Sequence, residues 1–188
     1  MNSEQKNVLS ETIKQVSDIV ENMNSTTACF TGHRSQKLPW RFNEDDERCK
    51  IMKEKLRIEI VKAIENGYKT FICGMAIGFD MICAETVLAL KKQYPDIKLI
   101  GALPCKTQDS KWFYKDKIRY RNLLDKLDGI RCIYDTYIGS ECMLERNRYM
   151  VNNSSLLIAL FDGITIGGTM STVEYAKMQN LKIVVIRP

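Results

Sequence analysis

The stretch LLIALFDGITIGGTMSTVEYAKMQ, residues 156–179, contains the three features that decide the fold. Its first part, from Leu156 to Phe161, is an apolar run that predicts a buried strand. A loop with two adjacent glycines follows, and helical spacing then continues to about Gln179. Glycines let the backbone approach an anion, and the free N–H groups at a helix start point toward it. This order of elements favours a phosphate site, although a plain turn between strand and helix would have the same pattern.

The glycine loop supplies the first candidate residues. We expect the ligand to contact Gly167, Gly168, Thr169, Ser171 and Thr172. Glu174 should lie on the first turn or so of the following helix. There its carboxylate could act on a ligand, or it could simply be favoured by the positive end of the helix dipole.

The same alternation of strands and helices extends outward through the chain. Apolar runs predict six strands, at residues 28–31, 69–73, 97–103, 130–134, 155–161 and 181–186. Helical spacing falls between them, including segments at about 46–66, 110–127 and 144–151. Such alternation predicts parallel βαβ units, whose right-handed crossovers put helices on both faces of one sheet. We therefore predict an α/β, Rossmann-like fold with a mostly parallel sheet of about six strands.

The N-terminal segment differs from the rest of the chain. Residues 1–26 are rich in polar side chains, and Val8, Ile13, Val16 and Val20 recur at helical spacing. We predict an N-terminal helical extension here, either packed on the domain or projecting as an arm. Residues 27–188 are expected to form the Rossmann-like domain.

Composition narrows the class of protein. The chain has 188 residues, of which 45% are hydrophobic and 27% charged, as in ordinary globular domains. No apolar run is long enough to span a membrane, and residues 1–23 lack the apolar core of a signal peptide. The seven cysteines include no Cys-x-x-Cys pair, and His33 is the single histidine. We therefore expect a cytoplasmic protein with reduced thiols, no membrane partner and no metal site.

The net charge of +5 is concentrated in one segment. From Lys106 to Arg131 there are eight Lys or Arg residues and four Asp, a local excess of +4. Aromatic residues are interleaved with these charges, which is compatible with nucleic-acid binding. However, Phe113, Tyr120 and Leu124 also recur at helical spacing, with Trp112 beside them. We favour an amphipathic helix whose apolar stripe, including Phe113, faces the core.

Further polar and glycine-rich motifs follow the other predicted strands. In a Rossmann-like sheet these motifs meet at the carboxyl ends of the strands, where ligands bind. We expect six further ligand-binding residues from the first two strand ends: Gly32, His33, Arg34, Gly74, Gly78 and Asp80. Two of them have structural alternatives, since Asp80 could cap a helix and His33 could be buried in the core.

Five motifs, spread over about residues 27–188, resemble those of a known superfamily. They are Thr31–Arg34, Gly74–Asp80, Pro104 with Gln108 and Trp112, Arg146–Val151, and Gly167–Thr169 followed by Thr172, Val173, Tyr175 and Ala176. In order and spacing they resemble the YpsA-like branch of the SLOG superfamily. This superfamily also includes the LOG phosphoribohydrolases and the Rossmann core of the DNA-processing protein A family. The resemblance implies binding of a nucleotide or a nucleotide-derived ligand.

The LOG enzymes carry an arginine and a glutamate that are implicated in cleaving the base from a nucleoside monophosphate. The resemblance places Arg146 on that arginine and Glu174 on that glutamate. It thereby implies these two as the catalytic candidates. Arg148 lies two residues further and should face another side of the helix, and we favour Arg146. The loop of the LOG enzymes has the form Gly-Gly-x-Gly-Thr-x-x-Glu. Its third glycine is Met170 here, and its threonine is Ser171. The resemblance therefore supports ligand binding by this chain more strongly than it supports catalysis.

Three functions remain as hypotheses. The leading one is binding of a nucleotide or nucleotide-derived small molecule at the strand carboxyl ends, with hydrolysis of an N-glycosidic bond by Glu174 and Arg146 as its further step. The alternative is a non-catalytic nucleotide sensor that acts through a protein partner. The third, less favoured, is a DNA-binding module that uses the basic helix near residues 111–121. No cofactor is predicted, a phosphate-bound Mg²⁺ stays open, and self-association into a homo-oligomer fits a domain of this kind.

Overall fold

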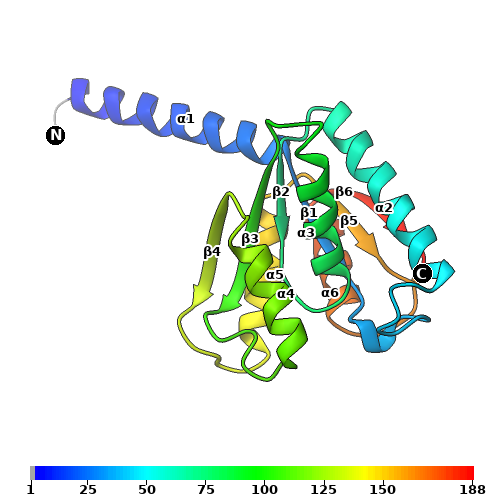
Figure 1. Cartoon of the computed structure of the whole chain (residues 1–188). Coiled ribbons are helices and arrows are strands. Elements are labelled where there is room, and N and C mark those ends of the chain that lie inside the picture. The colour runs from blue at the N-terminus through cyan, green and yellow to red at the C-terminus, as the bar shows by residue number, and fades with distance from the viewer. Residues whose placement is uncertain (1–2) are drawn as a thin grey trace.

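A computed structural model describes the backbone of residues 3–188 and, within that range, all side chains except those of residues 3, 4, 6–8 and 18–23. One six-stranded sheet forms the centre (Figure 1). Its strands are β1 (Thr27–Gly32), β2 (Thr70–Cys73), β3 (Lys98–Cys105), β4 (Gly129–Tyr134), β5 (Leu156–Leu160) and β6 (Lys182–Ile186). The helices are α1 (Ser3–Ser25), α2 (Glu47–Glu65), α3 (Phe79–Leu90), α4 (Tyr114–Leu124), α5 (Glu141–Asn152) and α6 (Gly168–Met178). The predicted Rossmann-like α/β fold is thus confirmed.

The strand order places a switch point at the middle of the sheet. All pairs are parallel, in the order β4-β3-β2-β1-β5-β6, so the chain runs outward from β1 in one direction and then returns to β1's other side. β1 pairs with β5 from Ala28 opposite Leu156 to Gly32 opposite Leu160. The loops after β1 and β5 therefore start at the same level, at the position where parallel α/β sheets bind ligands.

Two apolar layers hold the helices on the sheet. Neighbouring residues of β1 point to opposite faces, as the pleat requires. Phe30 belongs to the core beneath α2, α3 and α4, whereas Cys29 belongs to the core beneath α5 and α6 (Figure 1). Because both faces are covered, β5 is buried along its whole length, which explains its unbroken apolar sequence.

The N-terminal helix of the prediction is α1. In Figure 1 it projects from the amino-terminal end of β1, away from the body of the domain. Near its end Asn24 donates a hydrogen bond to the carbonyl oxygen of Asn152. Among residues 3–188, no helix is long and apolar enough to cross a membrane.

The basic helix differs from the prediction in where it begins. Residues 106–112 form turns and a bend instead of helix, and α4 starts only at Tyr114. Phe113 is the N-cap residue and is 83% exposed, so the prediction that it faces the core is wrong. Tyr120 and Leu123 do lie in the core, which confirms the apolar face of the helix itself.

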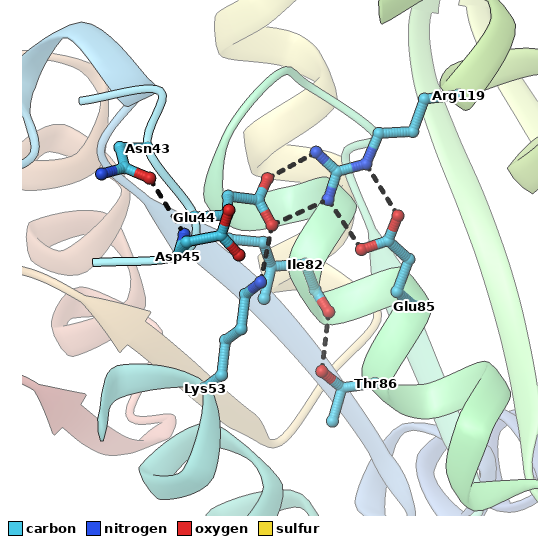
Figure 2. Close-up of polar contacts among 8 residues, drawn as sticks. All are labelled: Asn43, Glu44, Asp45, Lys53, Ile82, Glu85, Thr86 and Arg119. Carbon is cyan, nitrogen blue, oxygen red and sulfur yellow. Dashed lines mark hydrogen bonds and ion pairs between the residues drawn. The ribbon is translucent and has the colours of Figure 1, made fainter. Parts of the chain in front are cut away.

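A charge network ties α4 to its neighbours (Figure 2). Arg119 donates hydrogen bonds to Glu85 on α3 and to Glu44 in the loop before α2, and Lys53 pairs with Glu44 at 2.7 Å. Burial alone would raise the pKa of Glu44, but the hydrogen bonds from Arg119 and Lys53 outweigh it, and the pKa is lowered. The network therefore fixes the loop of residues 42–46 against α3 and α4 and occupies Arg119, one of the basic residues of that helix.

All seven cysteines are free, and six of them are buried. Burial raises the pKa of Cys29 to about 12 and that of Cys73 and Cys83 well above the ordinary value. Such thiols act as small apolar core residues.

Candidate functional site

A cavity of about 360 Å³ opens at the switch point between β1 and β5. Four segments line it: the end of β1 with the loop after it, the loop between β2 and α3, one side of α5, and the start of α6. These segments are distant in the sequence, and the parallel sheet brings them together at its carboxyl edge. The cavity therefore lies where the sequence motifs predict that a ligand binds.

The amino terminus of α6 forms one wall. The N–H of Ser171 donates to the carbonyl oxygen of Gly167, which closes the first turn of this helix. The N–H groups of Gly168 and Thr169 precede this bond, and the first N–H groups of a helix have no partner within the helix. Gly167, Gly168 and Thr169 all line the cavity. This wall offers backbone donors and the positive end of a helix dipole.

Two cationic side chains add positive charge from the loop after β1. Arg34 is exposed and lines the cavity. Lys37 also lines it, and its Nζ lies 3.3 Å from the carbonyl oxygen of Ile166, just before the start of α6. Both charges face the region that the helix terminus already makes favourable for an anion.

A buried ion pair forms the floor. Asp80 and Arg146 are 7% and 6% exposed, and their side chains approach to 3.7 Å between Oδ2 and Nη1. Asp80 Oδ2 accepts a hydrogen bond from the N–H of Ala76, and Arg146 Nη1 donates to the carbonyl oxygen of Gly74. Burial raises the pKa of Asp80 and lowers the pKa of Arg146, and each side chain is the counter-charge that opposes the shift of the other. The Nε of Arg146 is buried without a hydrogen-bond partner among the described residues.

Gly74 and Gly78 are explained by the space around them. A Cβ on Gly74 would lie 1.7 Å from Arg146 Nη1 and 2.7 Å from Asp80 Oδ2. Gly78 has a φ of +103°, and a Cβ there would lie 2.9 Å from the backbone nitrogen of Ser35. The two glycines thus let the loop before α3 pass close to the ion pair and to the loop after β1.

His33 lies beside the loop that leads to α6. It is 3% exposed, its ring contacts Phe161, and its Nε2 lies 3.4 Å from Asp162 Oδ1. Asp162 accepts hydrogen bonds from the side chain and the N–H of Thr165 and from the N–H of Ile164. The bonds from Thr165 are the main reason why the pKa of Asp162 is well below its ordinary value. Asp162 thereby shapes the turn that follows β5.

The structure brings most of the sequence-predicted residues together. Eight of the predicted residues line the cavity: Gly32, His33, Arg34, Asp80, Arg146, Gly167, Gly168 and Thr169. Gly74 and Gly78 do not line it, but each lies within close contact of residues that do. Sequence reasoning missed Lys37 and Asn147, which also line it. Asn147 could have been found from its place beside Arg146 on one helix. The position of Lys37 at the cavity depends on the fold of a loop, for which the sequence has no comparable signal.

Three predicted residues lie elsewhere. Ser171, Thr172 and Glu174 line a groove between α5 and α6 instead of the cavity. Thr172 is buried and holds the helix start, since its hydroxyl donates to the carbonyl oxygen of Gly168 and accepts from Asn147. The side chain of Glu174 is 54% exposed and pairs with Lys177 at 2.8 Å. Glu174 is five residues beyond Thr169, a rotation of roughly 140° about a helix axis, so the two residues face different ways.

Within the described residues, no group of three or more His, Cys, Asp or Glu side chains is placed to hold a metal ion. The site is thus one of backbone donors, cations and a buried ion pair. This composition suits a ligand with a phosphate group.

Comparison with known proteins gives one family match and several relatives. The family model described as the YspA SLOG family, named YpsA, matches residues 28–187. A UPF0398 protein of Brevibacillus brevis is 34% identical over 122 residues, which cover 64% of this chain and 65% of that protein. The uncharacterized SPbeta prophage-derived protein YoqJ of Bacillus subtilis is 35% identical over 139 residues, covering 67% of this chain and 80% of that protein.

Two solved structures share the fold. DNA processing protein A from Helicobacter pylori matches with a TM-score of 0.58 at 18% identity, over 88% of this chain and 66% of that chain. DNA processing protein A from Streptococcus pneumoniae matches with a TM-score of 0.57 at 14% identity, over 87% of this chain and 50% of that chain. This chain therefore spans less than two thirds of the Brevibacillus relative and of both DNA processing proteins.

Proposed function

Because the chain belongs to the YpsA SLOG family, we propose that it binds a nucleotide or a nucleotide-derived small molecule at the carboxyl ends of its parallel strands. One observation carries this proposal: a cavity at the topological switch point combines the start of α6 with Arg34, Lys37 and the buried Asp80–Arg146 pair. Helix termini at such switch points are favourable anion sites, and the cations increase that preference.

The proposal assigns a place to each part of the ligand. The phosphate lies against Gly167, Gly168 and Thr169, within reach of the two cations. The sugar lies over Asp80, whose buried carboxylate suits a hydroxyl donor. The base is directed toward the wall made by Arg34 and Ile77.

We propose binding without hydrolysis, in the manner of a ligand sensor. Glu174, the carboxylate that the LOG resemblance assigns to cleavage, lies in the groove between α5 and α6 and is paired with Lys177. A general base must come within hydrogen-bond reach of the reacting group. A catalytic role for Glu174 stays a prediction that this placement does not support, and release of free base from nucleoside monophosphates is expected to be absent.

Titration calorimetry with adenosine 5′-monophosphate (AMP) tests the proposal. Replacing Arg34 by alanine removes a charge-assisted contact to phosphate, and we expect the Kd to rise about 10- to 100-fold. Arg131→Ala is the matched control, because it removes the same charge from an exposed arginine on β4 that does not line the cavity. We expect that control to bind AMP as the unchanged protein does.

Two results would contradict the proposal. One is an equal loss of affinity in both arginine variants, which would indicate non-specific attraction. The other is the absence of binding to all four common nucleoside monophosphates. The H. pylori neighbour has a single-stranded DNA binding mode, so a short oligodeoxynucleotide belongs in the same series. Tighter binding of the oligonucleotide, lost when Lys115 and Lys117 are neutralised, would favour the DNA hypothesis instead.

A further inference from the structure

A second cavity of about 470 Å³ adjoins the first. The two share a wall that consists of Arg34, Gln36, Ala76, Ile77 and Met143. A ligand whose phosphate lies at the start of α6 would therefore reach the second cavity by passing this wall. The second cavity is thus the space next to the phosphate site in which the base of a bound nucleotide would fit.

Aromatic side chains surround the second cavity. Phe42, Trp112, Phe113 and Tyr137 line it, and they come from three loops that are far apart in the sequence. Phe42 is 59% exposed, Phe113 83% and Tyr137 57%. Single exposed aromatic residues need no explanation, but three around one hollow provide the flat apolar surfaces on which bases stack.

The aromatic side chains sit on supported segments. Trp112 is partly buried and packs edge-on against the core residue Tyr120, with ring centroids 5.0 Å apart. The loop that carries Phe42 is held two residues later by Glu44, which accepts hydrogen bonds from Arg119 (Figure 2). Pre-positioned surfaces lose less conformational entropy when a ligand binds.

Gln108 adds a polar group of defined direction. It is 9% exposed, it lines the second cavity, and its Nε2 donates a 2.8 Å hydrogen bond to the carbonyl oxygen of Met75. A flipped amide would oppose two oxygens, so this bond fixes the orientation of the group. Its Oε1 is buried and has no hydrogen-bond partner among the described residues. A buried acceptor without a partner is unfavourable, and a donor on a ligand would satisfy it.

We propose that the second cavity is a nucleobase subsite, an inference that rests on the proposed nucleotide binding. The base stacks on Phe113 and the neighbouring aromatic side chains, and an amino or ring N–H group of the base donates to Gln108 Oε1. Arg34, on the shared wall, lies between the base and the phosphate. The proposal thereby predicts that a base with such a donor binds more tightly than an otherwise similar base without it.

Phe113→Ala tests the stacking surface without disturbing the core, because the side chain is almost fully exposed. We expect the Kd for AMP to rise about 5- to 100-fold, as for loss of one base-stacking surface. Tyr114→Ala is the matched control, since Tyr114 is 80% exposed, directly adjacent and absent from the cavity lining. Inorganic phosphate, which lacks a base, should bind all three proteins equally.

A second titration tests Gln108 through the ligand. Purine riboside 5′-monophosphate lacks the amino group of AMP, so the unchanged protein should bind it about 10-fold more weakly. In Gln108→Ala this preference should disappear, and the ratio of the two Kd values is meaningful even where the variant is less stable.

The outcomes separate this inference from the proposed function. AMP binding that is equally tight in the unchanged protein, Phe113→Ala and Gln108→Ala, with no preference over purine riboside monophosphate, would overturn the base subsite alone. If the unchanged protein binds neither AMP nor the other three nucleoside monophosphates, both the subsite and the proposed function fall.

Discussion

Replacing Arg146 by methionine should lower the free energy of unfolding by about 3–5 kcal/mol, because it leaves the buried carboxylate of Asp80 without its counter-charge. Both side chains are less than 10% exposed, so water cannot take over the lost interaction. The variant also loses the hydrogen bond from Arg146 to the carbonyl oxygen of Gly74. Urea unfolding followed by circular dichroism measures the change.

The matched control is Arg148→Met, on the same helix. The side chain of Arg148 is 51% exposed and pairs with Glu145, and such surface pairs contribute about 0–1 kcal/mol. A second control, Asp80→Asn combined with Arg146→Met, removes the unpaired charge and should recover part of the loss. An Arg146→Met effect no larger than that of Arg148→Met would show that the pair does not stabilise the floor of the cavity.

The Arg146→Met effect should also depend on pH in a defined direction. Burial already raises the pKa of Asp80, and Arg146 opposes the rise, so its removal raises this pKa further. A raised folded-state pKa means that protonation favours the folded form. The stabilisation that protonated Asp80 gives the folded form is fully present below the unfolded-state pKa of about 3.9. It is lost as pH rises through the folded-state pKa. The deficit of the variant should therefore be smaller at pH 5 than at pH 7.

Adding one methyl group at Gly74 should destabilise the protein by about 2–3 kcal/mol, the upper range for overpacking a buried site. The new Cβ would overlap the guanidinium group of Arg146, which is itself held in place by Asp80 and by the backbone. Relief requires that the ion pair and the loop of residues 74–78 move, so AMP affinity should fall together with stability. Urea unfolding and calorimetry on the same preparation give both quantities.

Gly168→Ala is the control for Gly74→Ala. A Cβ on Gly168 meets no atom within 4 Å, and the position starts a helix, so stability should be unchanged or up to about 1 kcal/mol higher. The two substitutions add the same atoms, one beside the buried ion pair and one at the cavity wall formed by the start of α6. Equal stability in both variants would contradict the steric account of Gly74.

The sequence predicted the sheet and its binding edge because both depend on strong, local patterns. The apolar run of β5 could be recognised since a strand covered on both faces needs apolar side chains on both. Glycine-rich and polar motifs after β1, β2 and β5 then had to meet, because parallel strands share a carboxyl edge. The order of the motifs was sufficient for this prediction, and no side-chain geometry was required.

The direction in which an individual side chain points depends on where its helix starts, which the sequence patterns did not define. Because α6 begins at Gly168, Thr169 faces the cavity, whereas Glu174 is turned toward the groove beside α5. A motif match fixes the position of Glu174 in the chain but not its rotation about the helix axis. Phe113 is the same case, since α4 begins one residue after it and leaves its ring exposed. Lys37 belongs to a short 3₁₀ turn, where the sequence has no period to indicate direction.

The most direct test of the central claim is a ¹H–¹⁵N correlation spectrum recorded during a titration with inorganic phosphate and then with AMP. A phosphate at the start of α6 should shift the amide signals of Gly168 and Thr169 more than any others. We expect this result with inorganic phosphate and with AMP. AMP alone should add shifts around Gln108 and Phe113. Largest shifts on the basic residues of α4, with the α6 amides unchanged, would contradict the account.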